Sequence, residues 1–212
     1  MKLNLFNKAD NTNKNLLNVN NNDELFAAIT TLQNEINVGF DTKVIAVTSI
    51  KNDALAAAFG KALSDAYVKN ESSALIIDAN MYNPQLEGLL ELGDASKSDL
   101  VVEDGSVVGG YKLFNLSPKN AVVCIDKQVY PGVAYKNKAI HKIIKDNEKS
   151  YEHFIVLVPS IKDHKELVLL SDVVDAVVLV TKRSATKKQH IFDAVRFCEL
   201  NKLPLAKTVV IK

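Results

Sequence analysis

The chain has 212 residues, of which 47% are hydrophobic and 24% are charged, and its formal net charge at pH 7 is +1. These values are ordinary for a globular domain, and a net charge so close to zero excludes a strong electrostatic attraction to nucleic acid or to an acidic membrane. Two cysteines in apolar stretches, Cys124 and Cys198, predict buried free thiols and no disulfide framework or metal site.

The first 22 residues are polar and rich in asparagine. This composition predicts a flexible N-terminal arm over residues 1–22, followed by a single domain over 23–212. The sequence shows no signal peptide and no run of the roughly 20 apolar residues that a membrane span needs. We therefore expect a cytoplasmic protein without direct membrane insertion, which a partner could recruit to the membrane.

Helical and strand patterns alternate along the rest of the chain. Apolar residues at helical spacing from Leu25 to Ile36 predict a helix over 23–36. The apolar run VIAVTS predicts a strand over 44–49, and a stripe from Leu55 to Tyr67 predicts a helix that Asp53 caps. The helix that Asp53 caps is predicted over 54–67. Further helices are predicted over 84–91, 138–149, 164–171 and 185–201. Further strands are predicted over 74–78, 121–125, 153–158, 176–181 and 208–211.

The segment 92–120 is rich in Gly, Asp and Ser and is predicted to be the most loop-like internal part of the chain. Continuous apolar strands between amphipathic helices indicate an α/β fold, with a doubly wound, mostly parallel sheet and helices on both of its faces. Ligands of such sheets bind at the carboxyl ends of the strands. The segments in which to seek a site are therefore 48–53, 78–84, 158–163 and 181–186.

Four segments carry a resemblance to a known family: VIAVTS, ALIIDANMYNP, YEHFIVLVPS and SDVVDAVVLVTKRSATK. In this order and spacing, the chain resembles the bacterial tyrosine kinases of capsule and exopolysaccharide synthesis, a branch of the P-loop ATPases. The resemblance covers nearly the whole chain from residue 23, and ALIIDANMYNP is its most specific match. It implies a P-loop NTPase-like fold whose site combines a Walker A loop, a second acidic motif and a Walker B acid.

The Walker A position departs from the family pattern. A Walker A loop, G-x-x-x-x-G-K-[ST], wraps phosphates in backbone N–H groups, neutralises them with its lysine and holds magnesium through its hydroxyl. The resemblance places Ser49, Lys51, Asn52 and Asp53 here, in a shortened loop without glycine. Asn52 and Asp53 stand where the family has Lys and Ser/Thr, and the Asp53 carboxylate would repel a phosphate at the helix N-terminus. Lys51 is expected to be a solvated loop residue.

The other two motifs are altered as well. The second acidic motif keeps Asp78 but has Asn80 in place of its second aspartate. Tyr82 and Asn83 stand where the family has basic residues. The Walker B position is Val158, which can neither bind magnesium through a water molecule nor orient one. Asp78 is either a remaining magnesium-associated carboxylate or, as we favour, a polar residue that caps the next turn.

Two further family features are missing. The helix that forms rings in the family, E-x-x-R-x-x-R, reads Glu24-x-x-Ala27-x-x-Thr30 here, and the sequence as given carries no tyrosine cluster like the one in the family's tail.

Among the scattered tyrosines, Tyr82 and Tyr135 are expected to be exposed enough for another kinase to phosphorylate. A basic cluster is expected to be a solvated helix start, with contact to a phosphate or an acidic partner as the alternative. Its members are Lys182, Arg183, Lys187 and Lys188.

The residues leave three hypotheses open, ranked in this order. The first is a pseudokinase, which needs no cofactor and binds a membrane-anchored polysaccharide chain-length regulator or an active tyrosine kinase. The second is an ATP-binding or weakly active tyrosine kinase with an atypical phosphate loop, which would bind ATP and magnesium near Lys51, Asn52 and Asp78. The third is a relative of the partition or septum-placement ATPases. The net charge of +1 and the lack of a basic amphipathic tail speak against it, and we expect no nucleic-acid partner.

Overall fold

The structure is a computed structural model that describes residues 2–3, 23–37, 42–90 and 92–211. Its strands are β1 (Lys2–Leu3), β2 (Val44–Ser49), β3 (Ala74–Asp78), β4 (Ser96–Val101), β5 (Val107–Ser117), β6 (Asn120–Ile125), β7 (His153–Leu157), β8 (Ala176–Lys182) and β9 (Leu205–Ile211). Its helices are α1 (Asp23–Asn37), α2 (Asp53–Lys69), α3 (Leu86–Leu90), α4 (Pro131–Lys136), α5 (Ala139–Asn147), the 3-10 helix η3 (Glu166–Leu170) and α6 (Lys188–Leu200).

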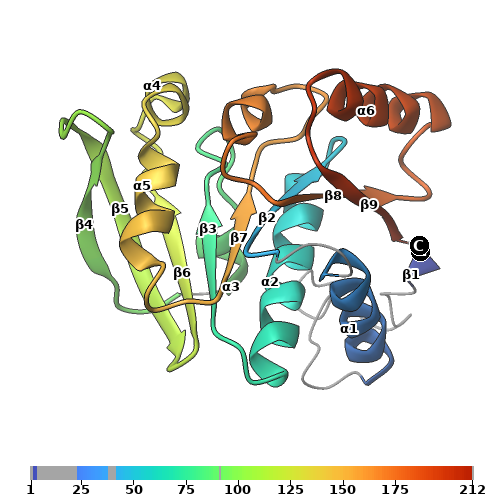
Figure 1. Ribbon diagram of the computed structural model, residues 1–212, viewed down its shortest axis with the longest axis horizontal. Helices are drawn as coiled ribbons and strands as arrows, with labels where there is room; N and C mark the ends of the chain where they lie inside the picture. Colours follow the sequence, from blue (N-terminus) through green and yellow to red (C-terminus); the bar gives the residue numbers. More distant parts are fainter. Residues whose placement is uncertain (1, 4–22, 38–41, 91, 212) are drawn as a thin grey trace.

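These strands form one sheet in the order β1-β9-β8-β2-β7-β3-β6-β5-β4 (Figure 1). Neighbouring strands are parallel from β1 to β6, and only β4, β5 and β6 pair antiparallel. The central strands β2 and β3 are buried at every position because helices cover both faces of the sheet, and buried parallel strands of this kind have largely apolar sequences. The doubly wound, mostly parallel α/β fold predicted from the sequence is confirmed.

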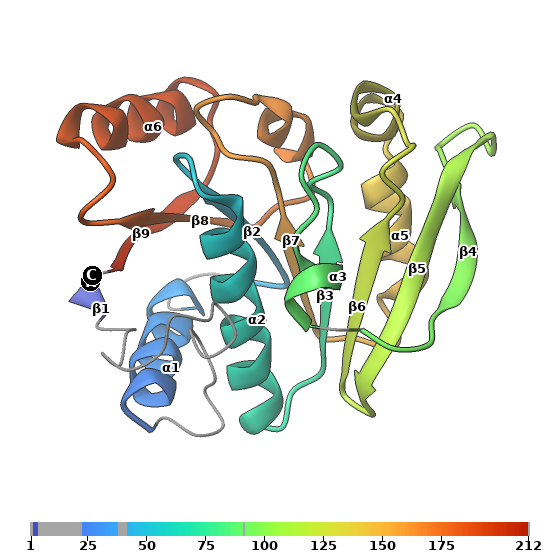
Figure 2. The ribbon, with the colours of Figure 1, turned by 180° about the vertical axis from the view of Figure 1, so that it is seen from behind.

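The helices form two layers. Helices α1, α2 and α3 cover one face of the sheet, and α4, α5 and α6 cover the other, as the front and back views show (Figure 1, Figure 2). Side chains alternate between the faces along each strand, so Ile45 packs with α1 and α2 whereas Val44 packs with the opposite helices. The prediction that Cys124 and Cys198 are buried free thiols is confirmed.

The prediction that 92–120 is the most loop-like internal part of the chain is wrong. Strands β4 and β5 form an antiparallel hairpin from this segment, and β5 pairs with β6. The outer strand β4 is exposed over its first four residues, Ser96 to Asp99, because it lies at the edge of the sheet. Edge strands carry polar and charged residues that discourage pairing with other chains, so this strand lacks the apolar run that predicts the central strands.

Smaller differences concern the ends of the chain and the short helices. Helix α4 lies where no helix is predicted, and the predicted helix over 164–171 is the 3-10 helix η3. Of the predicted arm, Lys2–Leu3 form β1 beside β9, whereas residues 4–22 lie outside the described residues, so the flexible arm stays a prediction. Within the described ranges, no helix is both long and apolar enough to cross a bilayer.

Gly60 lies in α2, where this helix makes a close contact with β7. A Cβ atom on Gly60 would lie 2.5 Å from Cδ2 of Leu157 and 3.4 Å from Cγ2 of Ile155. We expect Gly60→Val to lower the free energy of unfolding by about 2 kcal/mol, because overpacking forces neighbouring side chains or backbone to shift. Urea unfolding measures this change.

Gly88 in α3 provides the matched control, because nothing lies within 4 Å of the Cβ that a side chain would add there. The Gly88→Val change should alter the free energy of unfolding by no more than about 0.5 kcal/mol. Equal losses from the two substitutions would contradict a close contact at Gly60.

Candidate functional site

The topological switch point of the sheet lies at β2. From β2 the chain proceeds through β3 toward the edge strand β4, and after β7 it crosses to the other side of β2 to form β8 and β9. The loops that follow β2, β7 and β8 therefore diverge at the carboxyl edge of the sheet, which is the place where doubly wound proteins bind ligands. The carboxyl ends of β3 and β7 lie at the top of the sheet in Figure 1.

The loop after β2 is closed by its own side chains. Oγ of Ser49 accepts a hydrogen bond from the N–H of Asn52 at 2.9 Å, and Oδ1 of Asn52 accepts one from the N–H of Leu55 at 3.0 Å. Asn52 is therefore the N-cap of α2, and the prediction that Asp53 is the N-cap is wrong. An N-cap must have a non-helical backbone and a side chain that reaches the second or third N–H beyond it, and Asp53 already lies inside the helix.

Asp53 is the first residue of α2. Its Oδ2 accepts a hydrogen bond from Nδ2 of Asn83 at 3.3 Å, while its buried Oδ1 has no hydrogen-bond partner among the described residues. The carboxylate interacts favourably with the positive end of the helix dipole. A phosphate placed at this N-terminus would meet that negative charge.

Asp78 ends β3 and is only 1% exposed. Its Oδ2 accepts hydrogen bonds from the backbone N–H groups of Gln85 at 2.9 Å and Leu86 at 3.0 Å, at the start of α3, and its Oδ1 accepts one from the N–H of Asn80 at 3.3 Å. Burial raises the pKa of Asp78, and the three N–H donors oppose this with a smaller effect. Asn80, also buried, accepts a hydrogen bond from the N–H of Asn83 through Oδ1. Both side chains thus fasten the loop that follows β3.

The end of β7 carries apolar side chains on both faces of the sheet. Leu157 packs on the face that α2 covers, and Val158 packs on the opposite face. Beyond them, this loop is bound to the loop after β2. The hydroxyl of Thr48 donates to the carbonyl of Pro159 at 2.8 Å, and the N–H of Ile161 donates to the carbonyl of Ser49 at 2.9 Å. The two loops therefore form one connected edge of the site.

The two tyrosines that are predicted to be exposed differ. The Tyr82 side chain is 47% exposed, its ring stacks on His164, and its hydroxyl donates to the carboxylate of Glu166. This hydrogen bond is the main cause that raises the pKa of Tyr82 to about 12. The prediction that Tyr135 is exposed is wrong: its side chain is fully buried, and its hydroxyl donates to the carbonyl of Ala79 at 2.9 Å. Helix α4 turns this side chain into the core.

Lysines from different loops meet at the carboxyl edge. The side-chain contact with Lys51 is the main cause that lowers the pKa of the exposed Lys162. The carboxylate of Asp163 opposes this effect, and the positive charge of Lys187 adds to it weakly. Sequence reasoning singled out Lys51 and Lys187 but missed Lys162, whose only signal was its place in the loop after a buried strand.

Within the part of the chain that the structure describes, no group of three or more His, Cys, Asp and Glu side chains could hold a metal ion.

No family model matches the chain, and no curated protein matches it significantly. Solved structures do match. One is the crystal structure of the chimerical protein CapA2B2, with a TM-score of 0.73, 16% identity, and coverage of 92% of this chain and 88% of that chain. Another is the kinase domain of the Escherichia coli tyrosine kinase ETK, with a TM-score of 0.71, 14% identity, and coverage of 97% and 84%.

A ParA family ATPase from Chlorobium tepidum TLS also matches, with a TM-score of 0.53, 15% identity, and coverage of 81% of this chain and 74% of that chain. At these identities the likeness shows the fold alone. It confirms the P-loop NTPase-like fold implied by the sequence resemblance, and the TM-scores place that fold nearer to the tyrosine kinase domain than to the ParA family ATPase.

Proposed function

We propose that this chain is a catalytically inactive tyrosine-kinase-like protein, a pseudokinase, which acts as a partner or regulator in exopolysaccharide or capsule synthesis. The likeness of its fold to the kinase domain of ETK supports the kinase-like part of this proposal. The observation that carries the inactivity is the loop after β2, in which the side chains of Ser49 and Asn52 engage backbone N–H groups. A loop closed on itself in this way offers a phosphate no backbone cradle.

The charges around the loop support the same conclusion. Phosphoryl transfer depends on positioning and on neutralising the charge of the phosphates. Asp53 places a carboxylate at the start of α2, Leu157 and Val158 provide no acid for magnesium, and three backbone N–H groups already bind the Asp78 carboxylate. These residues do not fit ATP with magnesium and support no phosphoryl-transfer step.

Titration with ATP and ADP, with and without magnesium, tests this proposal. We expect neither heat in calorimetry nor a shift of the thermal unfolding midpoint. A ligand present at 100 times its dissociation constant would stabilise the folded state by about 2.7 kcal/mol, which both methods detect easily. Lys51→Ala is the matched variant, because Lys51 is the one cation of the loop after β2.

Magnesium-dependent binding that Lys51→Ala abolishes would overturn the pseudokinase proposal. It would favour the second hypothesis, an ATP-binding or weakly active tyrosine kinase in which Lys51, Asn52 and Asp78 lie near the nucleotide. Phosphate transfer to tyrosine would then be measured directly. The third hypothesis, a relative of partition or septum-placement ATPases, ranks last because the TM-score to the ParA family ATPase is 0.53 against 0.71 for the ETK kinase domain.

The proposed partner is a membrane-anchored polysaccharide chain-length regulator or an active tyrosine kinase. Such a partner would hold the chain at the cytoplasmic face of the membrane without insertion of the chain itself. Ring assembly through α1 is not part of this proposal, since Ala27 and Thr30 replace the basic residues of the ring-forming motif. Co-purification of the tagged chain with either partner, measured separately, would support the proposal, and a chain that engages neither would contradict it.

A further inference from the structure

A cleft of about 230 Å³ opens beside the closed loop, between the loops after β2 and β7 and helix α6. It is lined by Ile50, Ile161, Lys162, Lys165, His190, Asp193, Ala194 and Phe197. Its two loop walls are tied together by the hydrogen bond from the N–H of Ile161 to the carbonyl of Ser49. The cleft therefore lies at the switch point of the sheet, and hydrogen bonds fix its loop walls in place.

The inner walls of the cleft are apolar. Ile50 and Ile161 are each 2% exposed and Ala194 is 5% exposed. Lys165 does not break this surface, because its ammonium donates a hydrogen bond to the carbonyl of Ile161 and lies 4.5 Å from the centre of the Phe197 ring. A cavity of about 150 Å³ with apolar walls can hold benzene, so this cleft has room for a phenyl-sized group and part of a polar head.

The rim of the cleft is positively charged. Lys162 lines the cleft, Lys51 directly follows the lining residue Ile50 in the chain, and Lys187 directly precedes α6, the helix that forms the third wall. Among the described residues, none of these three lysines forms an ion pair within 4.0 Å. A lysine ammonium binds phosphate as a compact point charge, and three of them from three loops favour a dianion over a single negative charge.

Two carboxylates lie near this rim and are engaged elsewhere. Asp163 accepts a hydrogen bond from the hydroxyl of Ser160 at 3.1 Å. Asp193, on the α6 wall, accepts one from Nε2 of Gln189 at 2.8 Å. Among the described residues, neither carboxylate forms an ion pair within 4.0 Å with these lysines. The charge of Asp163 does act on Lys162, whose pKa it raises, but three ammonium groups against two carboxylates leave the rim with a net positive charge.

We propose that this cleft binds a small organic phosphate whose apolar part is about the size of a phenyl ring, with the phosphate held by Lys51, Lys162 and Lys187. The apolar group lies against Ile50, Ile161 and Ala194. This goes beyond the proposed function, because that function assigns no small-molecule ligand to the chain.

Calorimetric titration of the full chain with phenyl phosphate tests the proposal. Saturable binding is expected, at least about 10-fold tighter than for inorganic phosphate or for phenol, since each of these carries only half of the recognised chemistry. Lys162→Gln should weaken phenyl phosphate binding about 10-fold, the usual effect of losing one charge-assisted hydrogen bond.

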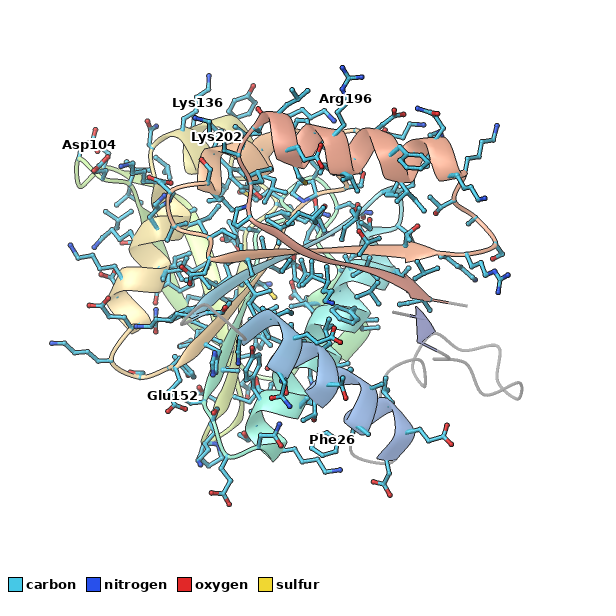
Figure 3. All side chains as sticks on the ribbon, turned by 45° about the vertical axis from the view of Figure 1, so that its right-hand side comes forward. Phe26, Asp104, Lys136, Glu152, Arg196 and Lys202 are labelled. Atoms are coloured by element: carbon cyan, nitrogen blue, oxygen red, sulfur yellow. The ribbon has the colours of Figure 1, made fainter. Side chains whose placement is uncertain are left out.

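Arg196→Gln is the matched control. Arg196 lies on α6, the helix that forms one wall of the cleft, but its side chain points away from the sheet into solvent (Figure 3). It should change the dissociation constant less than about twofold, as expected of a screened charge far from the ligand. Ala194→Leu fills the cleft and should abolish the preference for phenyl phosphate over inorganic phosphate. If this buried substitution prevents folding, the exposed Lys162→Gln variant still decides the question.

Three outcomes would overturn the proposal. They are the absence of saturable phenyl phosphate binding, equal binding by the wild type and Lys162→Gln, and one-for-one displacement of phenyl phosphate by ATP. The last would make the cleft part of a nucleotide site and would overturn the pseudokinase proposal too, whereas the first two leave that proposal intact.

A second arm of the titration distinguishes two sources of the same chemistry. N-acetyl-phosphotyrosine amide presents the phenyl phosphate group as a protein chain does. Binding at least as tight as that of phenyl phosphate supports the proposal with a protein phosphotyrosine as the source. Binding about 10-fold weaker supports it with a free phosphate ester as the source, because the attached backbone would then clash with the walls.

Discussion

Replacing Tyr135 with alanine is expected to lower the free energy of unfolding by about 4 kcal/mol, the usual cost of deleting a large buried ring. Tyr135 is among the largest fully buried side chains, with 0% exposure, and lies in the core between the sheet and helices α4 and α5. Its hydroxyl also holds the carbonyl of Ala79, in the loop that follows β3. Loss of the ring therefore removes both core packing and a support of the candidate site.

Tyr135→Phe separates the two contributions. It keeps the ring but leaves the buried carbonyl of Ala79 without this donor, which should cost about 1 to 2 kcal/mol. Urea unfolding of the two variants measures both numbers. A loss below about 1 kcal/mol for Tyr135→Ala would contradict the buried position, since exposed positions rarely cost more than about 0.5 kcal/mol. Phosphorylation of Tyr135 in the folded protein would contradict it as well.

Replacing Asp78 with alanine is expected to cost about 3 kcal/mol, because three backbone N–H groups lose their acceptor in a buried place. The affected groups belong to Asn80, Gln85 and Leu86. Asp163→Ala is the matched control at the same edge of the sheet. Asp163 is exposed, and among the described residues its carboxylate accepts a hydrogen bond from the hydroxyl of Ser160 alone. Its loss should therefore cost no more than about 0.5 kcal/mol.

The same substitution distinguishes the two roles considered for Asp78. A carboxylate that fastens the loop after β3 lowers stability when removed, whether or not magnesium or nucleotide is present. A carboxylate that serves magnesium would show little loss of stability but would abolish magnesium-dependent ligand binding. An unchanged urea midpoint for Asp78→Ala would therefore contradict the structural role.

The pH dependence of stability offers a separate test of Asp78. Burial raises its folded-state pKa above the ordinary value of 3.8, so between these two values the folded state binds more protons than the unfolded state. The stabilisation that protonation of Asp78 adds is then fully present below about pH 4 and is lost as the pH rises through the folded-state pKa. Asp78→Asn does not titrate, so the wild type should lose stability relative to this variant as the pH rises from 4 to 7. The opposite trend would mean that the N–H donors outweigh burial.

The central strands follow from the sequence because burial on both faces selects continuous apolar residues at each of their positions. The helices α1, α2 and α5 follow because one buried side imposes a period of 3.6 residues. The hairpin of β4 and β5 does not follow, because an edge strand pairs on one side only and tolerates polar residues at the exposed positions. Its pairing with β6 is decided by backbone hydrogen bonds between segments, which no local pattern records.

At the candidate site, the chemical groups that are present can be read from the amino-acid sequence. The loop after β2 has no glycine, Asp78 ends one central strand, and Val158 follows another. The contacts that these groups make depend on the folded arrangement of the chain. Asn52 rather than Asp53 caps α2, Tyr135 lies in the core rather than at the surface, and Lys162 lies beside Lys51. The physical reason is that a side chain's partners come from loops far apart in the chain, and the order of the strands brings those loops together.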